Sequence, residues 1–79
     1  MTYEVIADRP GVYRVVLEVR AEGVYVNVLE HANASEPYID MLQGDLAMAK
    51  RACSQDYGIA EHQWKEVSDV DWHAPDRME

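Results

Sequence analysis

Three histidines and one cysteine are the side chains of this sequence whose chemistry most often serves catalysis or metal binding. His31, His62 and His73 lie far apart, and none has a second histidine or a cysteine at the spacing of a zinc motif. The pair Asp69 and Asp71 begins like a calcium loop, but the glycine and the glutamate that such a loop requires do not follow. The sequence therefore predicts no metal site.

Cys53 would need a nearby base or cation to act as a nucleophile. It falls instead on an apolar series with helical spacing, formed by Ile39, Leu42, Leu46 and Ala49. This position predicts a buried and unreactive thiol. No glycine-rich phosphate loop is present either, so we expect no catalytic residue, no cofactor and no enzymatic activity.

The balance of charge excludes several classes of partner. The chain has 15 acidic and 7 basic residues, which give a formal charge of −8. Proteins that bind nucleic acid or anionic membranes concentrate Lys and Arg on one surface, whereas the basic residues here are scattered. We therefore expect neither nucleic acid nor a membrane as a partner. Half of the excess negative charge lies in residues 59–79, which form either a solvated acidic end or a surface for a basic protein partner.

The length of 79 residues allows one domain. The single cysteine permits no internal disulfide, and residues 1–6 lack the basic and apolar regions of a signal peptide. We therefore expect a cytoplasmic protein. A domain of this size buries little apolar surface for its length, so tight packing or self-association must add stability.

Alternating apolar residues predict three strands in the first half of the chain. They cover about residues 3–7, 12–20 and 24–30, and glycines mark the turns between them. The third strand is apolar on both faces, since Val24, Val26 and Val28 alternate with Tyr25 and Leu29. It is therefore either central in the sheet or covered by a second surface.

The apolar series that contains Cys53 predicts one long amphipathic helix before Gly58, with Ser35 as its N-cap. Gly44 interrupts this helix. It indicates a close approach to the sheet, a kink, or a break after which Asp45 caps a second helix, and we favour one distorted helix. Residues 62–67 are a candidate short fourth strand, and residues 68–79 form an acidic polar tail.

These elements predict an α+β fold in residues 1–67, with an antiparallel three-stranded meander packed on one helix in the order β-β-β-α(-β). One helix covers one face of such a sheet. The other face, together with the tail, is then the candidate interaction surface, made of Arg14, Val16, Glu18, Tyr25, Asn27 and Trp72. We expect a homodimer through this open sheet face.

Three classes of function are consistent with these features. The first is a small non-enzymatic interaction module that acts as a homodimer. The second is an acidic inhibitor or antitoxin-like protein that binds a basic protein partner. The third is a small ligand-binding protein or enzyme with a pocket between helix and sheet, for which the sequence offers no residues.

Overall fold

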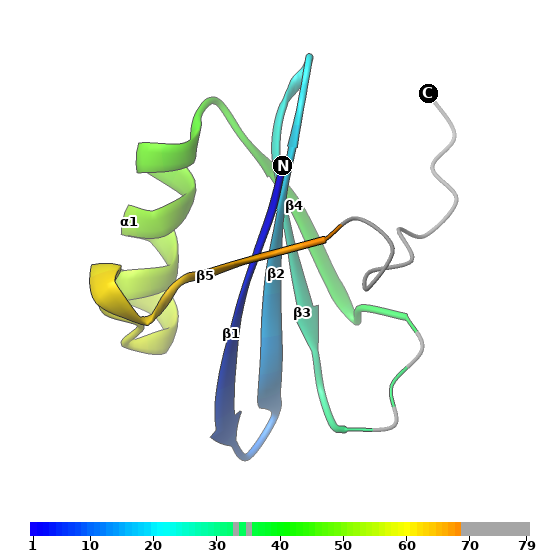
Figure 1. Cartoon of the computed structure of the whole chain (residues 1–79). Helices are drawn as coiled ribbons and strands as arrows, with labels where there is room; N and C mark the ends of the chain where they lie inside the picture. Colours follow the sequence, from blue (N-terminus) through cyan, green and yellow to red (C-terminus); the bar gives the residue numbers. More distant parts are fainter. Residues whose placement is uncertain (33, 35, 69–79) are drawn as a thin grey trace.

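The described residues form one antiparallel five-stranded sheet with a single α-helix on one side (Figure 1). This computed structural model describes residues 1–32, 34 and 36–68. The elements are β1 (Thr2–Arg9), β2 (Val12–Arg20), β3 (Gly23–Leu29), β4 (Ile39–Gln43), α1 (Leu46–Tyr57), a 3₁₀ turn (Glu61–Gln63) and β5 (Lys65–Val67). The strand order is β4-β3-β2-β1-β5. The prediction of an antiparallel α+β fold is confirmed at this level.

The three predicted strands form the centre of the sheet as an antiparallel meander. The turn between β1 and β2 contains Gly11 at φ +80°, and the turn between β2 and β3 leads into Gly23 at φ +144°. Both conformations favour glycine. A register shift between Ile6 and Arg9, with Asp8 at φ +50°, marks a bulge near the end of β1.

The prediction of one long helix is wrong in its first half. Residues Ile39–Gln43 form β4, which pairs with β3, and the helix begins only at Leu46. Asp45 is the N-cap of this helix, because its Oδ1 accepts a hydrogen bond of 2.8 Å from the backbone N–H of Met48. Gly44 is therefore a break between two elements. The predicted N-cap, Ser35, lies outside the described residues.

The prediction for the C-terminal part of the domain is met in part. The helix ends as expected at Gly58, in the left-handed conformation at φ +67°. The predicted strand over 62–67 is a 3₁₀ turn followed by the three residues of β5. This strand is the fifth of the sheet and pairs with β1. The predicted tail begins within the described chain at Ser68, and residues 69–79 lie outside the described residues.

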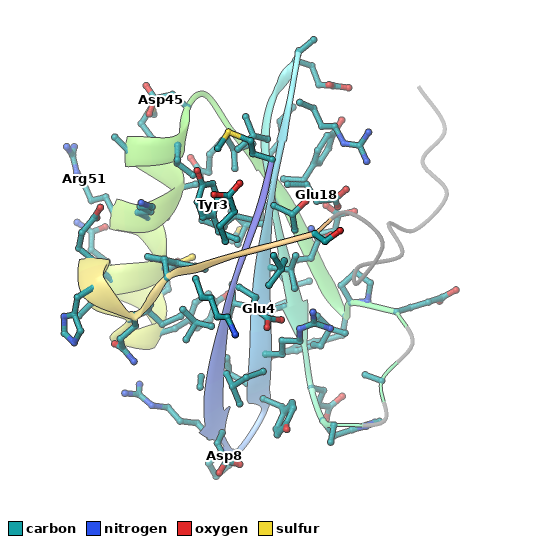
Figure 2. All side chains as sticks on the ribbon, in the orientation of Figure 1. Tyr3, Glu4, Asp8, Glu18, Asp45 and Arg51 are labelled. Carbon is teal, nitrogen blue, oxygen red and sulfur yellow. The ribbon has the colours of Figure 1, made fainter. Side chains whose placement is uncertain are left out.

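The core lies between α1 and the sheet. Ala49 and Cys53 on the helix are fully buried against residues of β1, β2 and β3, and Ile59 joins them after the helix end. Figure 2 shows Tyr3 on this helix side of the sheet. The sheet residues of the core are Val5, Val15, Leu17, Val24, Val26 and Val28. Among the described residues, no helix is long and apolar enough to cross a membrane.

The close approach at Gly23 generates a stability prediction. A Cβ atom at Gly23 would lie 2.4 Å from the backbone oxygen of Gln43, so β4 would have to move. We expect Gly23→Ala to lower the free energy of unfolding by about 3 kcal/mol or more. Gly11→Ala is the matched control, because a Cβ there meets no atom within 4 Å and adds only the backbone strain, about 1 kcal/mol. Urea unfolding measures both, and equal losses would contradict the packing argument.

Candidate interaction face

The side of the sheet away from α1, called the open face below, is set by the strand register. Residues directly opposite one another on neighbouring strands point to the same side, and Val15, Leu17 and Val26 point to the helix. The open face therefore carries Thr2, Glu4, Ile6, Arg14, Val16, Glu18, Arg20, Tyr25, Asn27, Leu29, Asp40, Leu42, Lys65 and Val67.

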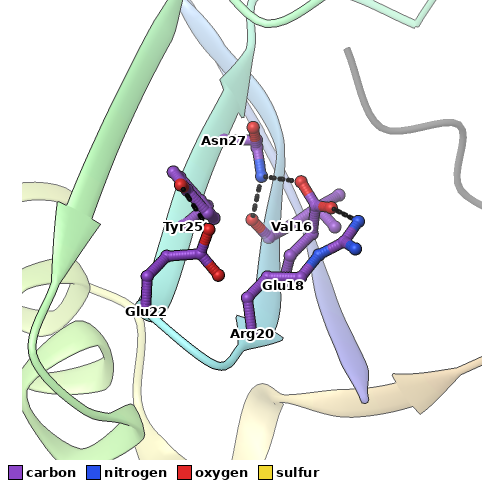
Figure 3. A network of polar contacts seen from close by, with 6 residues as sticks. All are labelled: Val16, Glu18, Arg20, Glu22, Tyr25 and Asn27. Carbon is purple, nitrogen blue, oxygen red and sulfur yellow. Dashed lines mark hydrogen bonds and ion pairs between the residues drawn. The ribbon is translucent and has the colours of Figure 1, made fainter. Parts of the chain in front are cut away.

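A buried polar cluster lies at the centre of the open face, on β2 and β3 (Figure 3). The Asn27 side chain is fully buried and donates both amide hydrogens, one to the Val16 carbonyl at 3.2 Å and one to Glu18 Oε1 at 3.0 Å. The other carboxylate oxygen, Oε2, accepts from Arg20 Nη2 at 2.9 Å. The strand alternation dictates this arrangement, since Asn27 lies opposite Val16 and diagonal to Glu18.

Glu18 is only 2% exposed, so its charge needs local compensation. The guanidinium of Arg20 provides the opposite charge, and the Asn27 amide provides a hydrogen bond. Arg20 itself remains 51% exposed. The carboxylate is thus held in a fixed position while its cation reaches the surface, where another molecule could meet it.

Two further polar pairs flank the cluster. Arg14 Nε donates to Glu4 Oε2 at 2.8 Å, across β1 and β2. The Tyr25 hydroxyl donates to Glu22 Oε2 at 3.2 Å near the turn between β2 and β3. These contacts hold long side chains of the open face in place.

The apolar residues of the open face fall into two groups. Val16 and Leu29 are buried, and Ala34 of the loop after β3 packs on them. Ile6 and Leu42 are 51% and 52% exposed and lie on β1 and β4. β2 and β3 lie between these two strands, so Ile6 and Leu42 are separate exposed apolar side chains on the two sides of the face.

The structure brings five of the six predicted interaction residues to this face: Arg14, Val16, Glu18, Tyr25 and Asn27. The sixth, Trp72, lies outside the described residues. Of the five, Val16, Glu18 and Asn27 are buried, and Arg14 and Tyr25 are half-buried. That these residues bind a partner stays a prediction.

Sequence reasoning missed several residues of the face, namely Arg20, Ile6, Leu42 and Glu4. The alternation of Arg20 and Glu4 with core residues along their strands is enough to place both on this face. Leu42 was assigned to a helix, which hid its position on the sheet.

The remaining candidates for chemistry lie apart from this face. Burial, and secondarily the charge of Asp56, raises the pKa of the Cys53 thiol to about 11. No group of three or more His, Cys, Asp or Glu within the described part of the chain is placed to hold a metal ion.

A groove of about 520 Å³ lies between α1 and the 3₁₀ turn. Lys50 donates to Glu61 Oε1 across it at 3.1 Å and lies over the Tyr3 ring, 5.4 Å from its centre. Its lining residues are Leu46, Ala47, Lys50, Arg51, Ser54, Ile59 and Glu61. Lys50 is thus engaged within the protein, by Glu61 and by the Tyr3 ring.

Comparisons with protein-family models, with curated proteins and with solved structures find no match for this chain.

The polar cluster generates a prediction with a pH dependence. Asn27→Asp places a second carboxylate against the buried Glu18, and we expect a loss of about 3 to 5 kcal/mol of stability at pH 7. Two adjacent carboxylates raise the pKa of one of them, so stability should return as the pH falls and that group takes up a proton.

Urea unfolding between pH 4 and pH 7 measures this effect. Glu18→Gln added to Asn27→Asp should recover most of the loss at pH 7, because it removes one charge and supplies an amide donor. If the double variant is no more stable than Asn27→Asp alone, the two side chains are not coupled as described.

Cys53 generates a second prediction on pH. Its pKa is raised from 9.0 to about 11, so the protonated thiol contributes stability that is complete below pH 9 and is lost as the pH rises from 9 to 11. The loss amounts to about 3 kcal/mol at most.

Cys53→Ala removes this contribution. The wild type should therefore lose more stability than the variant between pH 8 and pH 11 in urea unfolding. Tyr57, whose pKa is also raised, mainly by burial, titrates in both proteins. Parallel losses would show that the thiol is not buried as described.

Proposed function

We propose that this protein is a non-enzymatic interaction module whose open face binds another protein. The observation that carries the proposal is the Glu18–Asn27–Arg20 cluster, a charge pair held by hydrogen bonds at the centre of a sheet face that α1 does not cover. Because these side chains are already held, a partner that meets the face orders few of them on binding.

The residue types around the buried cluster on the open face support this function. Tyr and Arg are enriched in protein interfaces, and Tyr25, Arg14 and Arg20 lie there with the exposed Ile6 and Leu42. Among its described residues the face carries three acids (Glu4, Glu18, Asp40) and three bases (Arg14, Arg20, Lys65). Its charge is balanced, so shape and apolar contact should dominate recognition.

A different protein is a better occupant of the open face than a second copy. The sequence predicts a homodimer because a second copy would cover apolar residues of the middle strands. Val16 and Leu29 are already buried within one chain, so a second copy at this face would gain contact mainly with Ile6 and Leu42.

The excess of acidic residues supports a second candidate function, the acidic inhibitor of a basic protein. Among the described residues outside the open face, eight are acidic and three are basic. These charged residues lie in the end of β1, the turns, the loop after β3, α1, the 3₁₀ turn and β5. A basic partner would then bind through long-range attraction to these surfaces. Both candidate functions assume the cytoplasmic location that the single cysteine predicts.

Capture of partners by the tagged protein from its native cells tests the proposal. Ile6→Asp should reduce capture of the specific partner at least tenfold, because it places a charge on an exposed apolar position of the open face. Ala47→Asp is the control, since it adds the same charge on the exposed outer side of α1. Equal loss with both variants would contradict binding through the open face.

Salt dependence separates the two candidate functions. Exposed charges are screened within about 8 Å at 0.15 M salt. Binding through the balanced open face should change little between 50 mM and 500 mM salt, whereas binding of a basic partner to the acidic surfaces should weaken steeply.

A further inference from the structure

The two edges of the sheet differ in how they are protected from pairing with another strand. Natural sheets protect edges by shortness, by charged residues and by proline. The edge strand β5 has three residues, of which Lys65 and Glu66 are charged and exposed. The other edge strand, β4, has five residues (Ile39–Gln43) with the sequence IDMLQ, which contains one charged residue, Asp40, and no proline.

Exposed apolar side chains lie on both sides of the β4 edge. Leu42 is 52% exposed on the open face. Met48 is 48% exposed at the start of α1, and its sulfur lies 3.3 Å from where a Cβ on Gly44 would be, next to the end of β4. Met41 is half-buried on the helix side. A strand added along β4 would therefore meet apolar contacts on both of its faces.

We propose that β4 of a second copy pairs with β4 in antiparallel register about a twofold axis at Met41, which joins the two sheets into one. This register pairs all five residues of each strand. It places Ile39 opposite the partner's Gln43, Asp40 opposite the partner's Leu42, and Met41 opposite the partner's Met41. A twofold axis at Asp40 would instead set two like charges directly opposite each other, which is unfavourable.

A second copy of the chain is the partner that best fits this edge, because β4 can pair with itself. A twofold interface uses the same patch on both subunits, and the β4 pattern of apolar, acidic, apolar, apolar, polar residues places no charge opposite a like charge under that axis. A five-residue edge gives an interface below the size of a tight dimer. The dimer should therefore form in a concentration-dependent way.

Disulfide trapping tests the register. In the Met41→Cys variant the two new thiols lie directly opposite, at the ~4.5–5.5 Å Cα separation of paired antiparallel residues, within the range of a disulfide. Ile39→Cys and Gln43→Cys are matched controls on the same side of the same strand, because each lies about 13 Å from its own copy in this register. Cys53 is fully buried and stays out of the reaction.

Under mild oxidation we expect Met41→Cys to form a linked dimer at least tenfold faster than either control alone. An equal mixture of Ile39→Cys and Gln43→Cys should link the two proteins to each other, since these positions face one another. Equal rates for all three single variants, or linkage only of Ile39→Cys to itself, would overturn the proposed register.

Sedimentation equilibrium at concentrations from about 10 μM to 1 mM measures the association itself. Leu42→Asp, on β4, should weaken the dimer at least tenfold, because it sets a second carboxylate opposite the partner's Asp40, and Ile6→Asp, equally exposed but on β1, should leave it unchanged. A dimer that is more sensitive to Ile6→Asp would be a pairing of open faces, and it would overturn the proposal. A strict monomer at the highest concentration would also overturn it, whether or not the open face binds a different protein.

Discussion

The pairing of β2 with β3 is the constraint on which the rest of the structure depends. These strands occupy the middle of the sheet, and most of their residues are buried on both sides. A strand buried on both faces needs neighbours along its edges and cover above and below. The helix and the residue Ile59 provide that cover on one side. On the other side, Ala34 of the loop after β3 packs on Val16 and Leu29, and hydrogen bonds satisfy the buried polar groups of Glu18 and Asn27. β1 and β4 satisfy the outer hydrogen-bonding groups of the central pair.

The same constraint explains which parts of the fold could be predicted from the sequence. Alternation over residues 12–20 and the glycine turns are local signals, and they identified the meander. The five residues of β4 carry two competing local signals, because Ile39 and Leu42 fit a helical spacing whereas Ile39, Met41 and Gln43 fit a strand. Pairing with β3 decides between them, and this is a long-range contact that a local pattern cannot contain. A helix capped by Asp45 is one of the three interpretations of Gly44. Choosing it requires the knowledge that a strand ends just before Asp45.

The candidate site, like the fold, could be predicted from the sequence only in part. The middle strands identified Val16, Glu18, Tyr25 and Asn27 as residues of one face, since alternation fixes relative direction. Burial could not be predicted in the same way, because it depends on how the loop after β3 and the Arg20 side chain lie over the sheet. Thus three of the residues that the sequence places on a binding surface are buried, and the side chains accessible to a partner lie around them.

The pairing of β5 with β1 has a consequence for the order of folding. Thr2 lies opposite Val67, so this contact closes a loop that contains nearly the whole described chain. Closing so long a loop has an entropic cost that three paired residues offset only after the intervening strands and helix have formed. We therefore expect β5 to join the sheet last during folding and to leave it first in local opening, as the unit of lowest stability in the domain. The edge that β5 protects would then be exposed transiently, while the central pair stays closed.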